Sequence, residues 1–439
     1  MRRAVLSAAA LALASCATLP QQGETLDTLA QVYVALQLAI GEKEDGYIDA
    51  YYGPEELRER AVAEFSAKDL PQLEILTAAL RKRVGRYSDD GVEGTSMDER
   101  RARFLVAQLT AAYTRLRMMQ GEKLSFAEEA QGLFGVTPDT PPLGSFDPVI
   151  ARIDALVPGG GQGGAPLWQR LDEYYTRFDI PADRLQAVFD ASIAECKRRT
   201  LEHIAMPQGE SFTLAFVTDK PWSGYNYYQG NYASKIEVNT DLPIRLDRAI
   251  DLGCHEGYPG HHAFNALLEK NLVNDRGWTE FSVYPLYSPQ SLIAEGSANY
   301  GIPLAFPDGE QVAFETEVLA PLAGLPADRL AEYAALRNAL KDLGPARYTI
   351  ASEYLAGRIS GDEAKELLQR YQLLSPERAA QSLRFIDTYR SYIINYGLGR
   401  DMVRDWIERG EPDAATRWAR MEKLLSEPSL PSDLTAPPP

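Results

Sequence analysis

The chain is poor in cysteine and histidine, and it has no apolar run long enough to cross a membrane. Its 439 residues include 3 Cys and 4 His, and its longest apolar stretch, near the start, falls short of the about 20 residues that a spanning helix needs. Two cysteines, Cys196 and Cys254, lie in the body of the chain, too few for a disulfide framework. We expect both to be buried free thiols, with a single bridge between them as the alternative.

Positive charge is also scarce. The 45 Lys and Arg residues face 62 Asp and Glu residues, which gives a formal net charge of −17. Such a surface repels polyanions, so nucleic acid is excluded as an expected partner. The apolar and charged fractions are those of an ordinary globular protein. Because the chain is longer than one compact core usually holds, we expect two lobes or two domains.

The first 15 residues have the pattern of a signal peptide. Arg2 and Arg3 precede a short apolar stretch, and small residues lead to Cys16. This segment resembles the lipobox of bacterial lipoproteins, which implies that Cys16 becomes the lipid-bearing first residue and that residues 16–24 form a linker. Ala17 stands where aspartate is associated with inner-membrane retention. We therefore expect an exported, periplasmic protein anchored to the outer membrane, with a plain secretory signal as the alternative.

Helical spacing of apolar residues dominates the rest of the chain. It predicts an N-terminal helical lobe over residues 25–157, a glycine-rich loop over 158–166, and a second region over 167–427. Short runs rich in aromatic and β-branched residues between 211 and 238 predict a small antiparallel sheet. The proline-rich tail, residues 428–439, is expected to be disordered. The fold class is therefore mainly α.

Three of the four histidines lie between residues 255 and 262, beside Glu256. The segment reads HEGYPGHH, and a histidine followed at once by glutamate and then by a nearby histidine is typical of helical zinc peptidases. The fourth histidine, His203, is expected at the surface.

The spacing within this segment requires a break in the helix. On an ideal helix His261 lies about 240° round the axis from His255, so the two could not share a metal ion. Pro259 and Gly260 supply the break, because proline removes a helical hydrogen bond and glycine accepts unusual dihedrals. A two-residue bulge there would return His261 to the face of His255. We prefer His261 over His262 as the ligand and expect His262 to support the site.

A catalytic zinc site needs a third protein ligand and leaves a fourth position for water. Ser288 and Pro289 are typical of a helix start. Glu295 and Asn299 within that helix are four residues apart and share a face. We expect Glu295 to bind the metal and Asn299 to orient a ligating histidine.

The two segments together resemble a known family. HEGYPGHH at 255–262 and EGSANY at 295–300 look like the HExxPGHH and EGWAxYxE motifs of the DUF885 family, which is related in pattern to gluzincin metallopeptidases. The likeness spans roughly residues 210 to 400. The resemblance implies a two-lobed helical metallopeptidase-like fold with a small sheet beside the active-site cleft, and an edge strand at residues 236–240. Ser297 departs from the family pattern, where tryptophan is common.

The resemblance also implies a chemistry that the residues independently allow, namely zinc-dependent hydrolysis of peptide bonds. A metal-activated water would attack the amide, with Glu256 as the general base. Tyr396 is the candidate donor to the oxyanion, with Tyr392 and Arg400 behind it, and packing is the alternative role for these tyrosines. Zinc is the default ion, although nitrogen and oxygen ligands also accept cobalt, manganese or iron.

Substrate contacts are expected from Arg400, Tyr228 and Asn239, with ordinary sheet packing as the alternative for the last two. Two other functions remain open. One is a zinc amidase that acts on peptidoglycan stem peptides, which suits a periplasmic location. The other is a noncatalytic zinc-containing lipoprotein, against which the presence of Glu256 argues, because a structural site has no use for a base.

Overall fold

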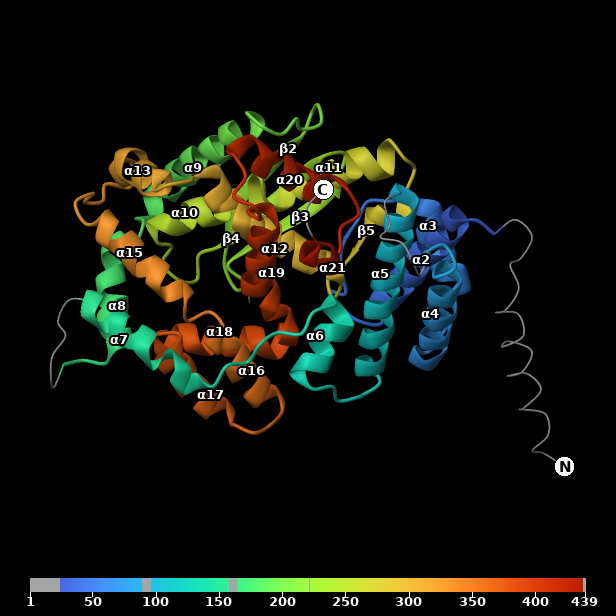
Figure 1. The fold of residues 1–439 in the computed structure, drawn as a ribbon, viewed down its shortest axis with the longest axis horizontal. Coiled ribbons are helices and arrows are strands. Elements are labelled where there is room, and N and C mark those ends of the chain that lie inside the picture. Colours follow the sequence, from blue (N-terminus) through green and yellow to red (C-terminus); the bar gives the residue numbers. More distant parts are fainter. Residues whose placement is uncertain (1–23, 89–95, 158–163, 221, 437–439) are drawn as a thin grey trace. The chain divides into compact units, whose positions relative to one another are not determined.

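The computed structural model describes residues 24–88, 96–157, 164–220 and 222–436, most of which are helical (Figure 1). The predicted mainly α fold class is confirmed. The predicted signal peptide, Cys16 and nearly all of the linker lie outside the described residues, as does most of the glycine-rich loop. Within the described ranges, no helix combines the length and the apolar character needed to cross a membrane.

The chain divides into two compact units, Met1–Lys123 with Leu272–Pro289, and Leu124–Asn271 with Gln290–Pro439. This division differs from the lobes expected from the sequence, since residues 124–157 belong to the second unit. One cause is α6 (Phe126–Phe134), whose buried Glu129 accepts hydrogen bonds from the side chains of Arg390 and Ser391. A buried carboxylate needs such partners, and they hold α6 to the second unit.

The described residues of the first unit form four α-helices and a two-stranded antiparallel sheet. The helices are α2 (Leu26–Gly41), α3 (Glu55–Glu64), α4 (Leu70–Val84) and α5 (Met97–Met119), and the strands are β1 (Ile48–Tyr51) and β5 (Val283–Pro285). Capping boxes begin α2, α4 and α5 at Thr25, Asp69 and Ser96. These side chains satisfy backbone donors that the first helical turn leaves unpaired.

The second unit holds a three-stranded sheet of β2 (Ser211–Val217), β3 (Gly224–Gly230) and β4 (Ala233–Asn239) in the order β2-β4-β3. Asn231 and Tyr232 both have positive φ, so β3 and β4 form a hairpin with a two-residue turn that matches strand twist. β2 is parallel to β4, so the expected antiparallel sheet is in fact mixed. The segment at 236–239, expected as an edge strand, lies in the central strand because β2 and β3 pair on either side of it.

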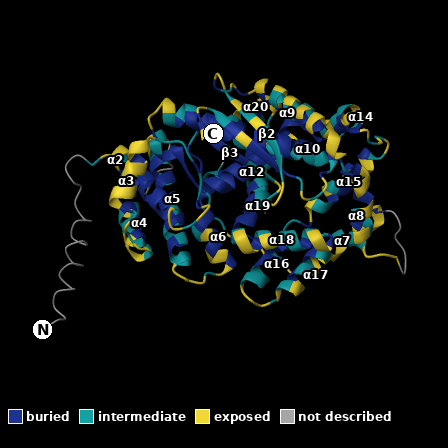
Figure 2. Ribbon diagram, turned by 180° about the vertical axis from the view of Figure 1, so that it is seen from behind, coloured by how far each residue is buried: buried dark blue, intermediate teal, exposed yellow. Residues whose placement is uncertain are grey.

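Helix α11 (His261–Leu268) packs against β3 and β4 of this sheet. The helices that build the site are α11 with α9 (Leu185–Leu201), α10 (Leu246–Leu252), α12 (Pro289–Ala305), α16 (Ala346–Leu355), α18 (Pro376–Tyr389) and α19 (Ile394–Ile407). The others are α7 (Asp147–Leu156), α8 (Leu167–Tyr175), α13 (Glu310–Phe314), α14 (Ala320–Ala323), α15 (Leu330–Lys341), α17 (Gly361–Tyr371), α20 (Ala414–Ser426) and α21 (Pro431–Thr435). Figure 2 shows α12 as a buried helix, which suits its largely apolar sequence.

A disulfide joins Cys196 of α9 to Cys254. The expectation of two free thiols is therefore wrong. Packing of α9 against the segment after α10 brings the two Cα atoms to 5.4 Å, well within the range that a disulfide bridges. The bridge ties the residue directly before His255 to a long helix.

The C-terminal segment is also more ordered than its proline content predicts. Residues Pro431–Thr435 form α21, and Leu430 and Leu434 are buried. The expected disorder is therefore wrong for this stretch, because its leucines bury apolar surface that offsets the entropy of ordering the chain. Residues 437–439 lie outside the described residues.

Candidate metal centre

The histidine segment is a helix that breaks and restarts. After α10 the chain forms a π-helical turn, Gly253–Gly257, that carries His255 and Glu256. It leaves helical geometry at Tyr258, passes through a cis peptide bond to Pro259, and restarts as α11 at His261. A Cβ atom on Gly260 would lie 1.8 Å from the carbonyl oxygen of His255, so only glycine fits there. The break places the Nε2 atoms of His255 and His261 3.1 Å apart.

Glu295 of α12 completes a group of three. Its Oε2 atom lies 3.2 Å from Nε2 of His255 and 3.8 Å from Nε2 of His261. The three residues each offer one ligand atom, and these atoms all lie within 4.8 Å of one another. Two imidazole nitrogens and a carboxylate oxygen form a donor set that zinc accepts in catalytic sites.

The carboxylate of Glu295 shows how well this group fits a metal ion. Its Oε1 atom accepts a hydrogen bond of 2.9 Å from the hydroxyl group of Tyr392, which fixes its orientation. Its Oε2 atom is buried and lacks a hydrogen bond, because the nearby histidine nitrogens are not aligned for one. A buried oxygen in this condition is costly unless it binds something else. A metal ion between Oε2 and the two imidazoles would satisfy it.

The pKa values of the three side chains suit metal binding. Burial lowers the pKa of His261 to about 4, so this imidazole is neutral at neutral pH. Burial also acts to lower the pKa of His255, but the carboxylate of Glu295, 3.2 Å away, and the charge of Glu256 outweigh it and raise the pKa above 6.5. The pKa of Glu295 is lowered, because the histidines and Tyr392 outweigh burial. A metal ion competes with protons for the imidazole of His255, so metal affinity should fall in acid.

Glu256 lies beside the group and against the edge strand. It is 4% exposed, and its backbone carbonyl accepts a hydrogen bond of 2.8 Å from the side chain of Asn226 on β3. A Cβ atom on Gly224 would lie 2.8 Å from Oε1 of Glu256, so the glycine at the start of β3 permits this approach. The strand next to Glu256 is therefore the edge strand β3.

Tyr396 approaches the group through a close helix crossing. A Cβ atom on Gly296 of α12 would lie 2.5 Å from the carbonyl oxygen of Gly399 of α19, so two glycines let the helices meet. The rings of Tyr396 and His255 are nearly parallel, with centroids 6.4 Å apart. Burial, and then the charges of Glu295 and Glu256, raise the pKa of Tyr396 well above 10. The phenol therefore stays protonated and can donate a hydrogen bond.

His262 is fully buried, and each of its ring nitrogens has a hydrogen-bond partner. Nδ1 lies 2.8 Å from the hydroxyl group of Ser234, and Nε2 lies 3.0 Å from a carboxylate oxygen of Glu210. Glu210 also pairs with Lys197 at 2.7 Å and accepts a hydrogen bond from Tyr258. The geometry thus favours His261 as the ligand. Sequence reasoning missed Glu210, which lies outside both motifs and about 50 residues away.

Other predicted residues make hydrogen bonds away from the three ligand side chains. The side chain of Asn299 donates to the backbone carbonyl of Glu295 on its own helix, at 2.8 Å. Its role in orienting a histidine stays a prediction. The residue that does orient a ligand side chain is Tyr392. The sequence suggests Tyr392 only as a support for Tyr396, the candidate donor to the oxyanion.

The three predicted substrate contacts are also engaged with neighbours. Asn239 donates to the backbone carbonyl groups of Lys220 and Trp222. The hydroxyl group of Tyr228 pairs with Glu269, and Arg400 pairs with Asp401 at 2.8 Å. Their roles in substrate binding stay predictions.

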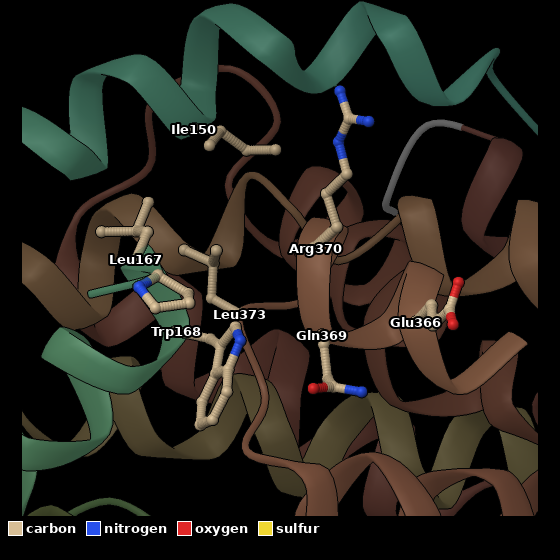
Figure 3. A pocket seen from close by; sticks show the side chains of 8 residues that line it. Ile150, Leu167, Trp168, Glu366, Gln369, Arg370 and Leu373 are labelled. Atoms are coloured by element: carbon tan, nitrogen blue, oxygen red, sulfur yellow. The ribbon is translucent and has the colours of Figure 1, made fainter. Parts of the chain in front are cut away.

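A separate hollow of about 340 Å³ lies between α7, α8 and α17 (Figure 3). Its lining includes Trp168, Gln369, Arg370 and Leu373. None of the predicted site residues lines it, so it is distinct from the candidate metal centre.

No family model matches the chain, and no curated protein matches it. The resemblance to the DUF885 family therefore stays a prediction. Two solved structures match the chain over most of its length. A candidate lipoprotein from Colwellia psychrerythraea has 13% identity and a TM-score of 0.48, over 80% of this chain and 69% of that chain. A carboxypeptidase from Pyrococcus furiosus has 13% identity and a TM-score of 0.45, over 90% of this chain and 88% of that chain.

Proposed function

We propose that this protein is a zinc metallopeptidase that hydrolyses peptide bonds, with His255, His261 and Glu295 as the metal ligands and Glu256 as the general base. One observation carries the proposal. Two imidazole nitrogens converge with an oxygen of Glu295 that has no hydrogen bond, and a second buried carboxylate lies beside them. A metal ion and a base side by side are the two requirements of metal-assisted hydrolysis.

The residues divide the chemistry among them. When bound, zinc would supply Lewis-acid activation of a water molecule and polarisation of the substrate carbonyl. Glu256 takes the proton of the attacking water and passes it to the leaving amine. Tyr396, held protonated by burial, donates a hydrogen bond to the oxygen that gains charge. The edge strand β3 offers backbone groups to an extended peptide.

The donor set supports a catalytic site over a structural one. Among the described residues, the group that could hold a metal ion has three members. Structural zinc sites are usually closed by four protein ligands, whereas catalytic sites keep one position for water. Glu256 has a role only in the catalytic case.

We also propose that the protein is exported and anchored through Cys16. The Cys196–Cys254 disulfide supports an oxidising compartment, where such bonds persist. Cys16→Ser should move the protein from the membrane fraction to the soluble periplasmic fraction. Continued membrane association of this variant would contradict the lipid anchor.

Hydrolysis of a mixed peptide library by residues 17–439, the exported chain without its lipid-bearing Cys16, tests the activity. Glu256→Gln should lower the rate by about 10²–10⁴-fold, the usual contribution of a general base. Glu310→Gln, at an exposed ion pair in the same unit, is the matched control and should keep full activity. Equal rates in the unaltered chain and Glu256→Gln would contradict the assigned role.

A further inference from the structure

Arg347, near the start of α16, places a guanidinium group against the aromatic rings that lead to His255. Its Cζ atom lies 5.4 Å from the centre of the Phe385 ring. The Phe385 ring lies 6.0 Å from the ring of Tyr396, which in turn lies 6.4 Å from the ring of His255. The guanidinium therefore belongs to the aromatic cluster that borders the metal ligands.

This guanidinium has no acidic partner among the described residues. Its Nε atom is buried without a hydrogen bond. Burial lowers the pKa of Arg347, and only the tyrosines Tyr396 and Tyr348 act in the opposite direction. The chain has 62 acidic residues, so the lack of a partner does not follow from a shortage of carboxylates. Leaving a buried charge unpaired lowers stability, and such groups are kept at functional sites.

Within the described ranges, Arg347 shares a buried Nε atom without a hydrogen bond with Arg245, Arg417 and Arg420. Three arginines outside this group have carboxylate partners. Arg101 binds Glu280 within the first unit, and Arg337 binds Glu315 through two hydrogen bonds of 2.8 and 2.9 Å. Arg248 also acts electrostatically on His255 and Glu256, but it pairs with Asp251 at 3.1 Å. Arg347 thus differs from them in having its donors free for a ligand.

We propose that Arg347 binds a carboxylate group of the substrate and thereby sets the substrate preference of the site. The inference rests on the proposed function, because it assigns the anion to the peptide that is hydrolysed. A guanidinium presents two parallel donors that match a carboxylate, and the pairing is strong where water is excluded. The carboxylate has two sources in a peptide, namely the C-terminus and the side chain of Asp or Glu.

The overall charge of the protein makes this residue more important. A net charge of −17 repels an anionic peptide at long range. Discrimination in favour of a carboxylate must therefore come from a local cation near the reacting bond. Arg347 meets that need without first breaking an existing ion pair.

The test compares the zinc-loaded exported chain with Arg347→Met and with the matched control Arg404→Met, which removes an exposed arginine of α19. Substrates are one peptide with a free C-terminus, its C-terminal amide, and amides that carry Glu or Gln at each position. Arg347→Met should lower kcat/KM for carboxylate-bearing peptides by about 10- to 150-fold and leave the neutral amides unchanged. The free-acid and Glu series show which source is used.

Stability separates this role from a structural one. Because the guanidinium group, whose Nε atom is buried, has no acidic partner among the described residues, Arg347→Met should melt at or above the temperature of the unaltered chain. A lower melting temperature with an equal loss on all substrates would overturn the inference. If Arg347→Met does not fold, Arg347→Lys takes its place, with a smaller loss that is again confined to carboxylate substrates. A loss shared by all substrates would again overturn it.

A binding measurement keeps the two proposals distinct. If the unaltered chain hydrolyses no peptide, the proposed function fails, and calorimetry then measures binding of an N-acetyl dipeptide and of its amide. Preference for the free acid that Arg347→Met abolishes would support the carboxylate site alone. Equal binding of acid and amide, or no binding of either, would overturn it.

Discussion

Removing the hydroxyl group of Tyr392 tests whether the carboxylate of Glu295 is held for a metal ion. The hydroxyl group donates a 2.9 Å hydrogen bond to Oε1, and both residues are buried. A hydrogen bond to a charged group contributes about 1.5–3 kcal/mol, and partners that orient a ligand change metal affinity by about 10- to 100-fold. We expect Tyr392→Phe to raise the zinc Kd by that factor.

Tyr300→Phe is the matched control. Tyr300 lies on α12, the helix that carries Glu295, and is 2% exposed. It donates a 2.8 Å hydrogen bond to Glu408, away from the ligands. Both variants should lower the free energy of unfolding by about 1–3 kcal/mol, but only Tyr392→Phe should weaken zinc binding. Competition with a chelator gives the Kd, and guanidinium unfolding of the metal-free protein gives the stability. Equal zinc affinity in folded Tyr392→Phe and the unaltered chain would refute the reasoning.

Three further predictions concern the surroundings of the ligands. Gly260→Ala should abolish metal binding in a dialysis assay, because its Cβ atom would overlap the carbonyl group of His255. Gly257→Ala is the control and should retain metal binding, because its Cβ atom would meet only the Phe212 ring, at 3.6 Å. Replacing both cysteines by serine opens a loop of 58 residues and should lower the free energy of unfolding by about 4 kcal/mol, with weaker zinc binding; unchanged unfolding would contradict it. Burial raises the pKa of Glu210, but hydrogen bonds from His262, Lys197 and Tyr258 outweigh it and lower the pKa from 4.5 to about 2. Its contribution of about 3 kcal/mol to the free energy of unfolding is therefore present above pH 4.5 and is lost as the pH falls towards 2. Urea unfolding should show that Glu210→Gln is less stable than the unaltered chain at neutral pH and that this difference shrinks in acid.

The sequence predicts much of the candidate site because local chemistry specifies it. Proline and glycine at 259 and 260 forbid a continuous helix, and the break is what brings His255 and His261 together. Small residues at 296 and 298 favour a close approach to the histidine helix, whereas the close approach that the structure shows is that of Gly296 to Gly399 of α19. These inferences depend on backbone sterics, which a short segment largely determines.

The sequence does not specify contacts between residues that lie far apart along the chain. Nothing in the segment around Glu210 indicates its pairing with His262 in another element. The periodicity of 211–217 predicts a strand but not that β4 inserts between β2 and β3, so strand order and direction were missed. Whether Cys196 and Cys254 meet depends on how α9 packs, which apolar spacing does not specify.

Zinc content per chain tests the central claim most directly. The exported chain, Glu256→Gln and His261→Ala are each loaded with zinc, dialysed and measured by mass spectrometry of the metal. We predict one zinc ion in the first two and none retained in His261→Ala, because removal of one of three ligands opens the site. Zinc retained equally by His261→Ala, or no zinc bound by the unaltered chain, would contradict the assignment of His255, His261 and Glu295 as a metal centre.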